Sequence, residues 1–263
     1  MSNQTWQRTR APSPATSSSW ARSSSSPDRD RGAVRPIVAP HDPSTQDLTL
    51  RLRPPFWLDG AVPGMPLGTD ELGRDVLSRL IYGARVSLLV GVAATILSGV
   101  IGTTAGLIAG QRGGRVGSVI MRLADVQLGI PSLLLALAVI AAFGSGFWRV
   151  IIILGVTGWV GYARIVRSEV LSLREREFVL AANAIGVTQT RIAVRHLLPN
   201  VMASIATIAT LQVAAVIIAE ASLSYLGLGV PPTIPTWGAC SARVRASSAA
   251  PGGSPSSRAS RSC

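Results

Sequence analysis

Four long apolar runs constrain the fold of this chain more than any other feature. They cover residues 86–110, 126–143, 150–166 and 201–218. A helix needs about 20 apolar residues to cross a membrane, with about 17 as the lower limit. Only 14% of the 263 residues are charged, against about 25% in an ordinary globular domain. The sequence therefore predicts an all-α fold, a polytopic membrane helical bundle with four recognisable transmembrane helices.

The charge and motif content argues against nucleic-acid binding and against catalysis. All 25 basic residues are arginine, and none is lysine, so the net charge of +12 indicates codon bias more than phosphate contacts. There is no GxxxxGK[ST] phosphate loop, metal-ligand cluster or nucleophile motif. Cys240 and Cys263 lack partners at ligand spacing. We expect no enzyme activity, no metal and no cofactor, with any ATP bound by another polypeptide.

Small residues recur within the first apolar run at intervals of four or seven. They are Gly91, Ser98, Gly102, Gly106 and Gly110. This spacing places them on one helix face, where they would permit close helix packing. The alternative is that they are ordinary filler of a membrane helix.

The arginines predict the orientation. Arg112, Arg115 and Arg122 lie between the first two runs, and six more lie between the third and the fourth: Arg164, Arg167, Arg174, Arg176, Arg191 and Arg195. The positive-inside rule makes both loops cytoplasmic. With four spans, residues 1–85 and those after about Leu226 would then be outside, although residues 1–85 show no export signal.

The two ends differ in composition from the middle. Residues 1–35 and 239–263 are mixtures of Ser, Arg, Ala and Pro without an apolar period. As protein they are expected to be disordered. A GC-rich coding region translated out of frame gives a similar composition, so disordered tails and out-of-frame tails both remain open.

The polar segment of about residues 164–200 is long enough for two helices, with Gly186 as the break and Pro199 as the stop. Ala181, Ala182 and Ala184 would give a low helix surface that another protein can approach closely. Arg191 and Arg195, four residues apart, would share one face. The segment is predicted to bind a soluble partner; a solvated loop without a partner is the alternative.

Residues 36–85 are expected to form an extracytoplasmic loop that ends in an interfacial helix. Asp75, Arg79 and Tyr82 lie three or four residues apart on a helix predicted within residues 68–85, and apolar residues occupy its other surface. Two interpretations remain open: contact with an external protein, or simple anchoring at the outer membrane face.

Three blocks of sequence carry a resemblance to a known family. They are PLGTDELGRDVLSRLIYGARVSL at 66–88, EFVLAANAIGVTQTRIAVRHLLPN at 177–200 and EASLSYLGLGVPPTIPTWG at 220–238. Together they resemble the permease subunits of bacterial ABC importers for dipeptides and oligopeptides, and in particular the second of the two paired permeases. The resemblance covers about residues 36–238, with a transmembrane permease domain at 86–238.

The resemblance implies about six membrane helices with both termini cytoplasmic. One helix would precede the stretch Ala39–Pro43, and another would follow Trp237 and Gly238. Ser/Arg-rich sequence stands in both places, so the ends are interpreted as frameshifted or truncated.

The resemblance also implies how the chain works. The 164–200 segment would form coupling helices that dock into an ATPase subunit, through Glu177, Leu180, Ala181, Ala182, Gly186, Arg191, Arg195, His196, Leu198 and Pro199. The family pattern has Glu where this chain has Leu180 and a basic residue where it has Asn183. Expected partners are a related permease in a heterodimer, two ATPase subunits and an extracytoplasmic substrate-binding protein, in the bacterial inner membrane.

Three further positions are candidates for the pathway or the outer face: Glu220, Asp75 and Arg79. An acid at the end of a membrane span is a functional candidate, and Glu220 would either line the route or orient helices. The cargo is predicted to be di- or oligopeptides, with nickel or another small solute as the alternative. A non-functional truncated membrane fragment is the competing interpretation.

Overall fold

The fold was analysed in a computed structural model that describes residues 40–231 and 233–240. These residues belong to one compact unit, 35–263. The predictions for the tails at 1–35 and from 241 onward fall outside the described residues. Ala239 and Cys240, by contrast, lie in a helical turn with buried side chains.

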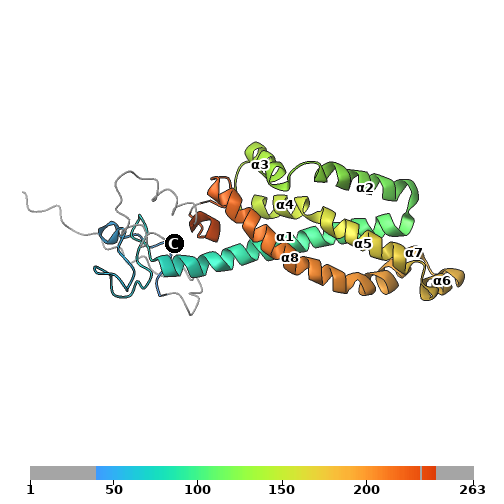
Figure 1. The fold of residues 1–263 in the computed structure, drawn as a ribbon, viewed down its shortest axis with the longest axis horizontal. Coiled ribbons are helices and arrows are strands. Elements are labelled where there is room, and N and C mark those ends of the chain that lie inside the picture. Colours follow the sequence, from blue (N-terminus) through green and yellow to red (C-terminus); the bar gives the residue numbers. More distant parts are fainter. Residues whose placement is uncertain (1–39, 232, 241–263) are drawn as a thin grey trace, which may run out of the picture. The chain divides into compact units, whose positions relative to one another are not determined.

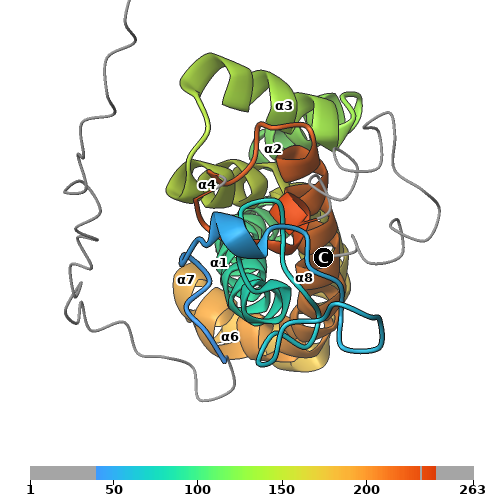
Figure 2. The ribbon, with the colours of Figure 1, turned by 90° about the vertical axis from the view of Figure 1, so that its left-hand side faces the viewer.

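The described residues are helical and form no named strand, which confirms the all-α fold class. The helices are α1 (Val76–Arg112), α2 (Gly114–Leu128), α3 (Ser132–Phe143), α4 (Phe147–Thr157), α5 (Trp159–Leu173), α6 (Glu177–Ala184), α7 (Gln189–Ile192) and α8 (Leu198–Tyr225). A short 3-10 turn, η1, covers Leu48–Leu50, and a π turn, η2, covers Ala193–Leu197. Helix α1 is central, and α4, α5 and α8 pack along it (Figures 1 and 2).

The small residues of α1 form the contact with its neighbours. A Cβ atom added to Gly102 would lie 2.4 Å from the carbonyl oxygen of Trp159, and one added to Gly106 would lie 2.7 Å from that of Ala163. Added to Gly110, it would lie 2.7 Å from a methyl group of Val170. These distances are shorter than van der Waals contact, so α1 and α5 approach this closely only because the glycines have no side chain. The predicted packing face is confirmed.

Three of the helical stretches are long and apolar enough to cross a membrane. They are Val76–Arg112, Phe147–Leu173 and Gln189–Tyr225. The first, third and fourth predicted spans lie within them. The third is interrupted at Gly158, between α4 and α5.

The second predicted span, 126–143, is not one continuous helix, but α2 and α3 together qualify as one bent span, so the described residues have three or four candidate crossings. The chain leaves the helix at Gly129–Pro131, and α2 and α3 are bent by 86°. The residue before a proline is pushed out of the α conformation, which explains the break. Helix α3 has 12 residues, about 18 Å at 1.5 Å per residue, and cannot cross the roughly 30 Å hydrocarbon core alone.

The separate interfacial helix predicted within 68–85 is also wrong. Helix α1 begins at Val76 and continues without a break to Arg112, and Asp75 is its N-cap, not a helical residue. Gly83 lies between residues 76 and 86 but does not end the helix, and no proline stands there. At 37 residues, α1 is about 55 Å long, so part of it must project beyond the hydrocarbon core.

The predicted stop at Pro199 is a third error. Pro199 lies in the first turn of α8, and the helical stretch continues through it from Gln189 to Tyr225. Proline has no N–H group to donate to the preceding turn. The π turn η2 directly before it lets the chain change its hydrogen-bond register without breaking the helix.

The loop predictions agree with the arrangement of the helices. The turn between α1 and α2, which carries Arg112 and Arg115, lies at the same end of α1 as α6 and α7 (Figure 1). The loop of residues 40–75 lies at the opposite end (Figure 1). Both loops predicted to be cytoplasmic therefore lie at one end of the bundle, which the predicted orientation requires.

Candidate functional site

The segment between α5 and α8, residues 174–197, is called the connector below. Its first helix, α6, ends in a turn in which Gly186 has φ +78°. Val187 donates to the carbonyl oxygen of Ala182 at 3.1 Å and Gly186 donates to that of Asn183 at 3.0 Å. A left-handed residue at this place closes a helix, and glycine adopts it without strain. Gly186 is therefore the break between two helices, as predicted.

One face of the connector packs onto the membrane helices. Val179, Ala182 and Ile192 are buried against Val166 and Val170 of α5. Because Ala182 is only 7% exposed, it is not free for a second protein. Its predicted part in docking is thus indirect.

Polar contacts attach the connector to the inner end of α1. The Gln111 side-chain amide donates to the backbone oxygen of Gln189 at 2.5 Å and to its side-chain oxygen at 3.1 Å. The Gln189 amide in turn donates to Asn183 at 2.8 Å. The two glutamines thus link α6 and α7 to α1. Sequence analysis missed this pair, since two glutamines 78 residues apart give no local signal.

The opposite face of the connector is apolar and exposed. Its large side chains are Phe178, Leu180, Ile185 and Val194. Ile185, next to the break, is 81% exposed. Ala181 and Ala184 are also exposed, and their small side chains add little bulk to this surface. Exposed apolar side chains at the polar end of a membrane protein make the connector a candidate for a protein interaction site.

The charged candidates of the connector are exposed as well. Arg191 and Arg195 are exposed, and neither forms an ion pair with another described residue. Glu177 is exposed in the first turn of α6. The His196 ring lies 6.4 Å from that of Phe178, so it packs on the connector. Leu198 is half-buried, and Pro199 is exposed at the start of α8.

Glu220 lies elsewhere, on α8 near the outer end, and is fully buried. Its carboxylate accepts from the Ser224 hydroxyl at 2.7 Å and from the Ser87 hydroxyl of α1 at 3.5 Å. Ser87 also accepts from the backbone N–H of Trp237 at 3.2 Å. These contacts join α1, α8 and the segment after α8, which favours helix orientation over pathway lining.

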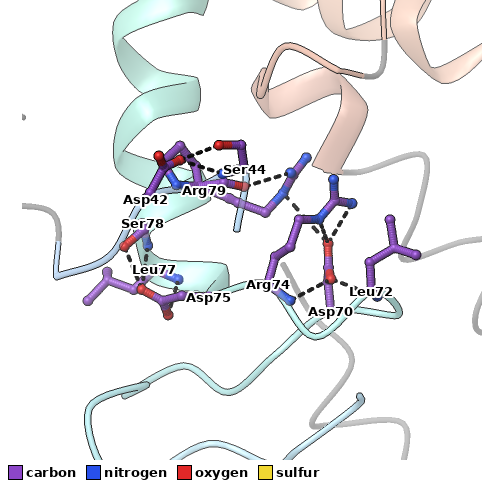
Figure 3. A network of polar contacts seen from close by, with 10 residues as sticks. Asp42, Ser44, Asp70, Leu72, Arg74, Asp75, Leu77, Ser78 and Arg79 are labelled. Carbon is purple, nitrogen blue, oxygen red and sulfur yellow. Dashed lines mark hydrogen bonds and ion pairs between the residues drawn. The ribbon is translucent and has the colours of Figure 1, made fainter. Parts of the chain in front are cut away.

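Asp75 and Arg79 are also buried, with 2% and 3% exposure. Asp75 caps α1 by accepting from the backbone N–H of Ser78 at 3.1 Å and from its hydroxyl at 2.5 Å. The guanidinium of Arg79 lies 3.7 Å from Asp70, and that of Arg74 lies 2.8 Å from it (Figure 3). Both predicted residues thus hold the outer loop onto α1, and neither presents a surface to a partner.

Asp70 is the residue of this network that sequence analysis did not select. It accepts from the backbone N–H groups of Leu72 and Arg74, at 2.8 and 3.0 Å, as well as from the Arg74 side chain (Figure 3). Asp70 and Arg74 are four residues apart, and this spacing in the sequence already indicated that the two side chains could form an ion pair. The packing of Arg79 onto the same carboxylate required the tertiary structure.

Comparison with known proteins places these features in one family. Residues 102–247 match the family model described as binding-protein-dependent transport system inner membrane component. The match covers the C-terminal part of α1 and all of the helices from α2 to α8, including the whole connector.

Three relatives show the extent of the similarity. The di/tripeptide transport system permease protein DppC of Pseudomonas aeruginosa is 43% identical, over 80% of this chain and 69% of its own length. In Bacillus subtilis, the dipeptide permease DppC is 43% identical over 78% of this chain and 62% of its own length. The oligopeptide permease OppC of the same organism is 41% identical over 77% of this chain and 65% of its own length. The chain therefore belongs to the family of inner membrane components of binding-protein-dependent transport systems.

Proposed function

We propose that this chain is the permease subunit of an ATP-driven importer that moves di- and oligopeptides across the bacterial cytoplasmic membrane. The cargo is taken from the relatives, which are named as di/tripeptide, dipeptide and oligopeptide permeases. The observation that carries the proposal is the exposed apolar face of the connector, attached to the membrane helices on its other side.

The connector couples ATP hydrolysis to the membrane helices in this proposal. A separate ATPase subunit binds the apolar face around Ile185, with Arg191 and Arg195 beside it for acidic groups of the partner. Movement of the docked connector reaches α1 through Gln111 and Gln189, and reaches α5 and α8 through the buried core around Val170. ATP therefore acts without being bound by this chain.

The assembly proposed is two permeases, this chain and a related one, with two ATPase subunits and an external substrate-binding protein. The loop of residues 40–75 lies at the outer end. Its exposed side chains, Phe56 and Trp57 among them, are the candidates for contact with the binding protein or the membrane surface. The buried Asp75 and Arg79 stabilise the attachment of this loop to the start of α1.

The docking proposal is tested by Ile185→Asp in the complete transporter. Burying an isoleucine side chain contributes about 1.5–3 kcal/mol, and each 1.4 kcal/mol is about tenfold in affinity. We therefore expect the amount of ATPase subunit that copurifies to fall at least about tenfold. Leu48→Asp is the matched control, because Leu48 is 69% exposed on the outer loop.

Equal loss in both variants would indicate general damage, and undiminished copurification of Ile185→Asp would contradict docking through this face. The cargo is tested separately by uptake into cells that express the complete transporter. Uptake of a labelled tripeptide is expected. Uptake of labelled nickel without peptide would replace the peptide assignment and leave the docking proposal unchanged.

A further inference from the structure

Three membrane helices meet at the interruption between α4 and α5. A Cβ atom added to Gly158 would lie 2.5 Å from the Ser98 hydroxyl of α1 and 2.8 Å from the Gln212 side-chain nitrogen of α8. Gly158 is thus a point where the interrupted span closely approaches both α1 and α8. Gln212 is near the middle of α8, so this meeting point is far from either end of that helix.

The backbone at the interruption has its own hydrogen-bond partners. Ser98 donates its hydroxyl to the carbonyl oxygen of Gly155 at 2.7 Å. The Gln127 amide donates to the carbonyl oxygen of Thr157 at 2.5 Å, and Trp159 donates its indole N–H to Gln127 at 2.7 Å. An interrupted helix is tolerated within a membrane only where such groups, or water in a cavity, satisfy the backbone. Gln212 is not needed for that purpose.

A pocket of about 100 Å³ opens beside Gly158. That volume can hold several water molecules or a group the size of an amide. It is lined by Ser132, Leu133, Leu154, Thr157, Gly158, Gln212, Ala215, Val216 and Ala219. None of these residues is charged. The side chains of Ser132 and Gln212 form no hydrogen bond with another described residue.

We propose that this pocket is a cargo-contact site of the translocation pathway, in which the Gln212 carboxamide pairs with a peptide group of the passing substrate. The inference rests on the proposed function and deepens it. A carboxamide offers both donors and an acceptor, as a peptide group does, so the two can pair through two hydrogen bonds. The hydroxyl of Ser132, at the first residue of α3, offers a further hydrogen-bonding group.

The chemistry of the lining favours the peptide group over other ligands. Divalent metal sites in proteins are built mainly on carboxylate, imidazole or thiolate ligands, and the pocket has none of these. The charged termini of a peptide would require opposite charges, which are also missing from the lining. Neutral hydrogen-bonding groups can recognise the peptide group, which every short peptide contains whatever its side chains.

The test compares uptake of a tripeptide with uptake of the same tripeptide N-methylated at its peptide groups, by cells with the complete transporter. N-methylation removes the donor of each peptide group. Wild type is expected to prefer the unmodified tripeptide at least about tenfold in kcat/KM. Gln212→Leu is expected to reduce this preference toward one, mainly through KM, and Gln212→Asn is expected to retain part of it. Thr210→Val, an exposed position of α8 outside the pocket, is expected to leave it unchanged.

A Gln212→Leu transporter that keeps the full preference would overturn this inference while the proposed function stands. Wild type that imports no peptide would overturn both. If Gln212→Leu fails to assemble, Gln212→Cys in a chain with Cys240 and Cys263 replaced by Ala gives a second measurement. A hydrophilic thiol reagent should modify it, more slowly with tripeptide present, and Leu211→Cys should show no such protection. No protection at 212 would overturn the inference.

Discussion

At the scale of single residues, burial separates structural from functional polar groups. Glu220, Asp75 and Arg79 all attract attention in the sequence, and all three side chains have polar partners inside the chain. Gln212 is unremarkable in the sequence, yet its amide lacks a partner among the described residues. An unpaired polar group within a membrane span is costly, and this makes the glutamine the stronger functional candidate.

Glu220 provides a prediction at this scale. Its carboxylate holds Ser224 and, on α1, Ser87. Glu220→Ala leaves both hydroxyls without that acceptor, and each buried unsatisfied group costs about 1–3 kcal/mol. We expect a clearly lower midpoint of thermal unfolding for the purified transporter, whereas Glu220→Gln, which still accepts through its amide oxygen, should lose much less.

Normal stability of Glu220→Ala together with lost peptide uptake would contradict this assignment. That result would indicate that Glu220 lines the translocation pathway, which is the other interpretation of an acid at this position.

At the scale of secondary-structure elements, the contact between α1 and α5 determines the bundle. The glycines of α1 face the backbone of α5, and a Cβ at Gly106 would lie 2.8 Å from the Cβ of Val166. Close backbone approach provides the dispersion contacts that hold helices together in lipid. The spacing of these glycines predicted a face, and the structure identifies α5 as its main partner.

A pair of glycine-to-alanine substitutions tests this contact. Gly106→Ala should force the helices apart and destabilise the bundle by about 1–3 kcal/mol, the usual range for overpacking. Gly161→Ala is the matched control on α5, since a Cβ there meets nothing within 4 Å. It should be neutral or stabilising by up to about 1 kcal/mol through helix propensity. Thermal unfolding of both purified variants gives the comparison, and equal midpoints would refute the packing argument.

At the scale of the whole molecule, the orientation in the membrane follows from which loops share an end. The α1–α2 turn and the connector lie together at the end of α1 opposite to residues 40–75 (Figure 1). As an inner-membrane protein with several spans, the chain should have its arginine-bearing loops in the cytoplasm.

Cysteine labelling checks this orientation. In a chain with Cys240 and Cys263 replaced by Ser, Leu58→Cys on the outer loop should react with a membrane-impermeant thiol reagent in intact cells. Thr190→Cys in α7 should react only after permeabilisation. The reverse pattern would invert the topology and remove the basis for cytoplasmic docking.

The sequence by itself determined the class of the protein and the position of its main parts. Apolar length, the glycine spacing of α1, the arginine distribution and the break at Gly186 are local or periodic properties. Each can be evaluated without knowing what the segment touches. The family blocks at 66–88, 177–200 and 220–238 added the functional class in the same way.

Only the tertiary structure decided how those parts are used. It showed that the chain bends sharply between α2 and α3 and that α1 includes the residues predicted as an interfacial helix. It also showed that the helical stretch ending in α8 continues through Pro199. It also turned Ala182 inward and left Ile185 exposed. The physical reason is that burial and hydrogen-bond satisfaction depend on groups far apart in the chain, such as Ser87 and Glu220 or Ser98 and Gly155, and no local pattern of residues specifies those partners.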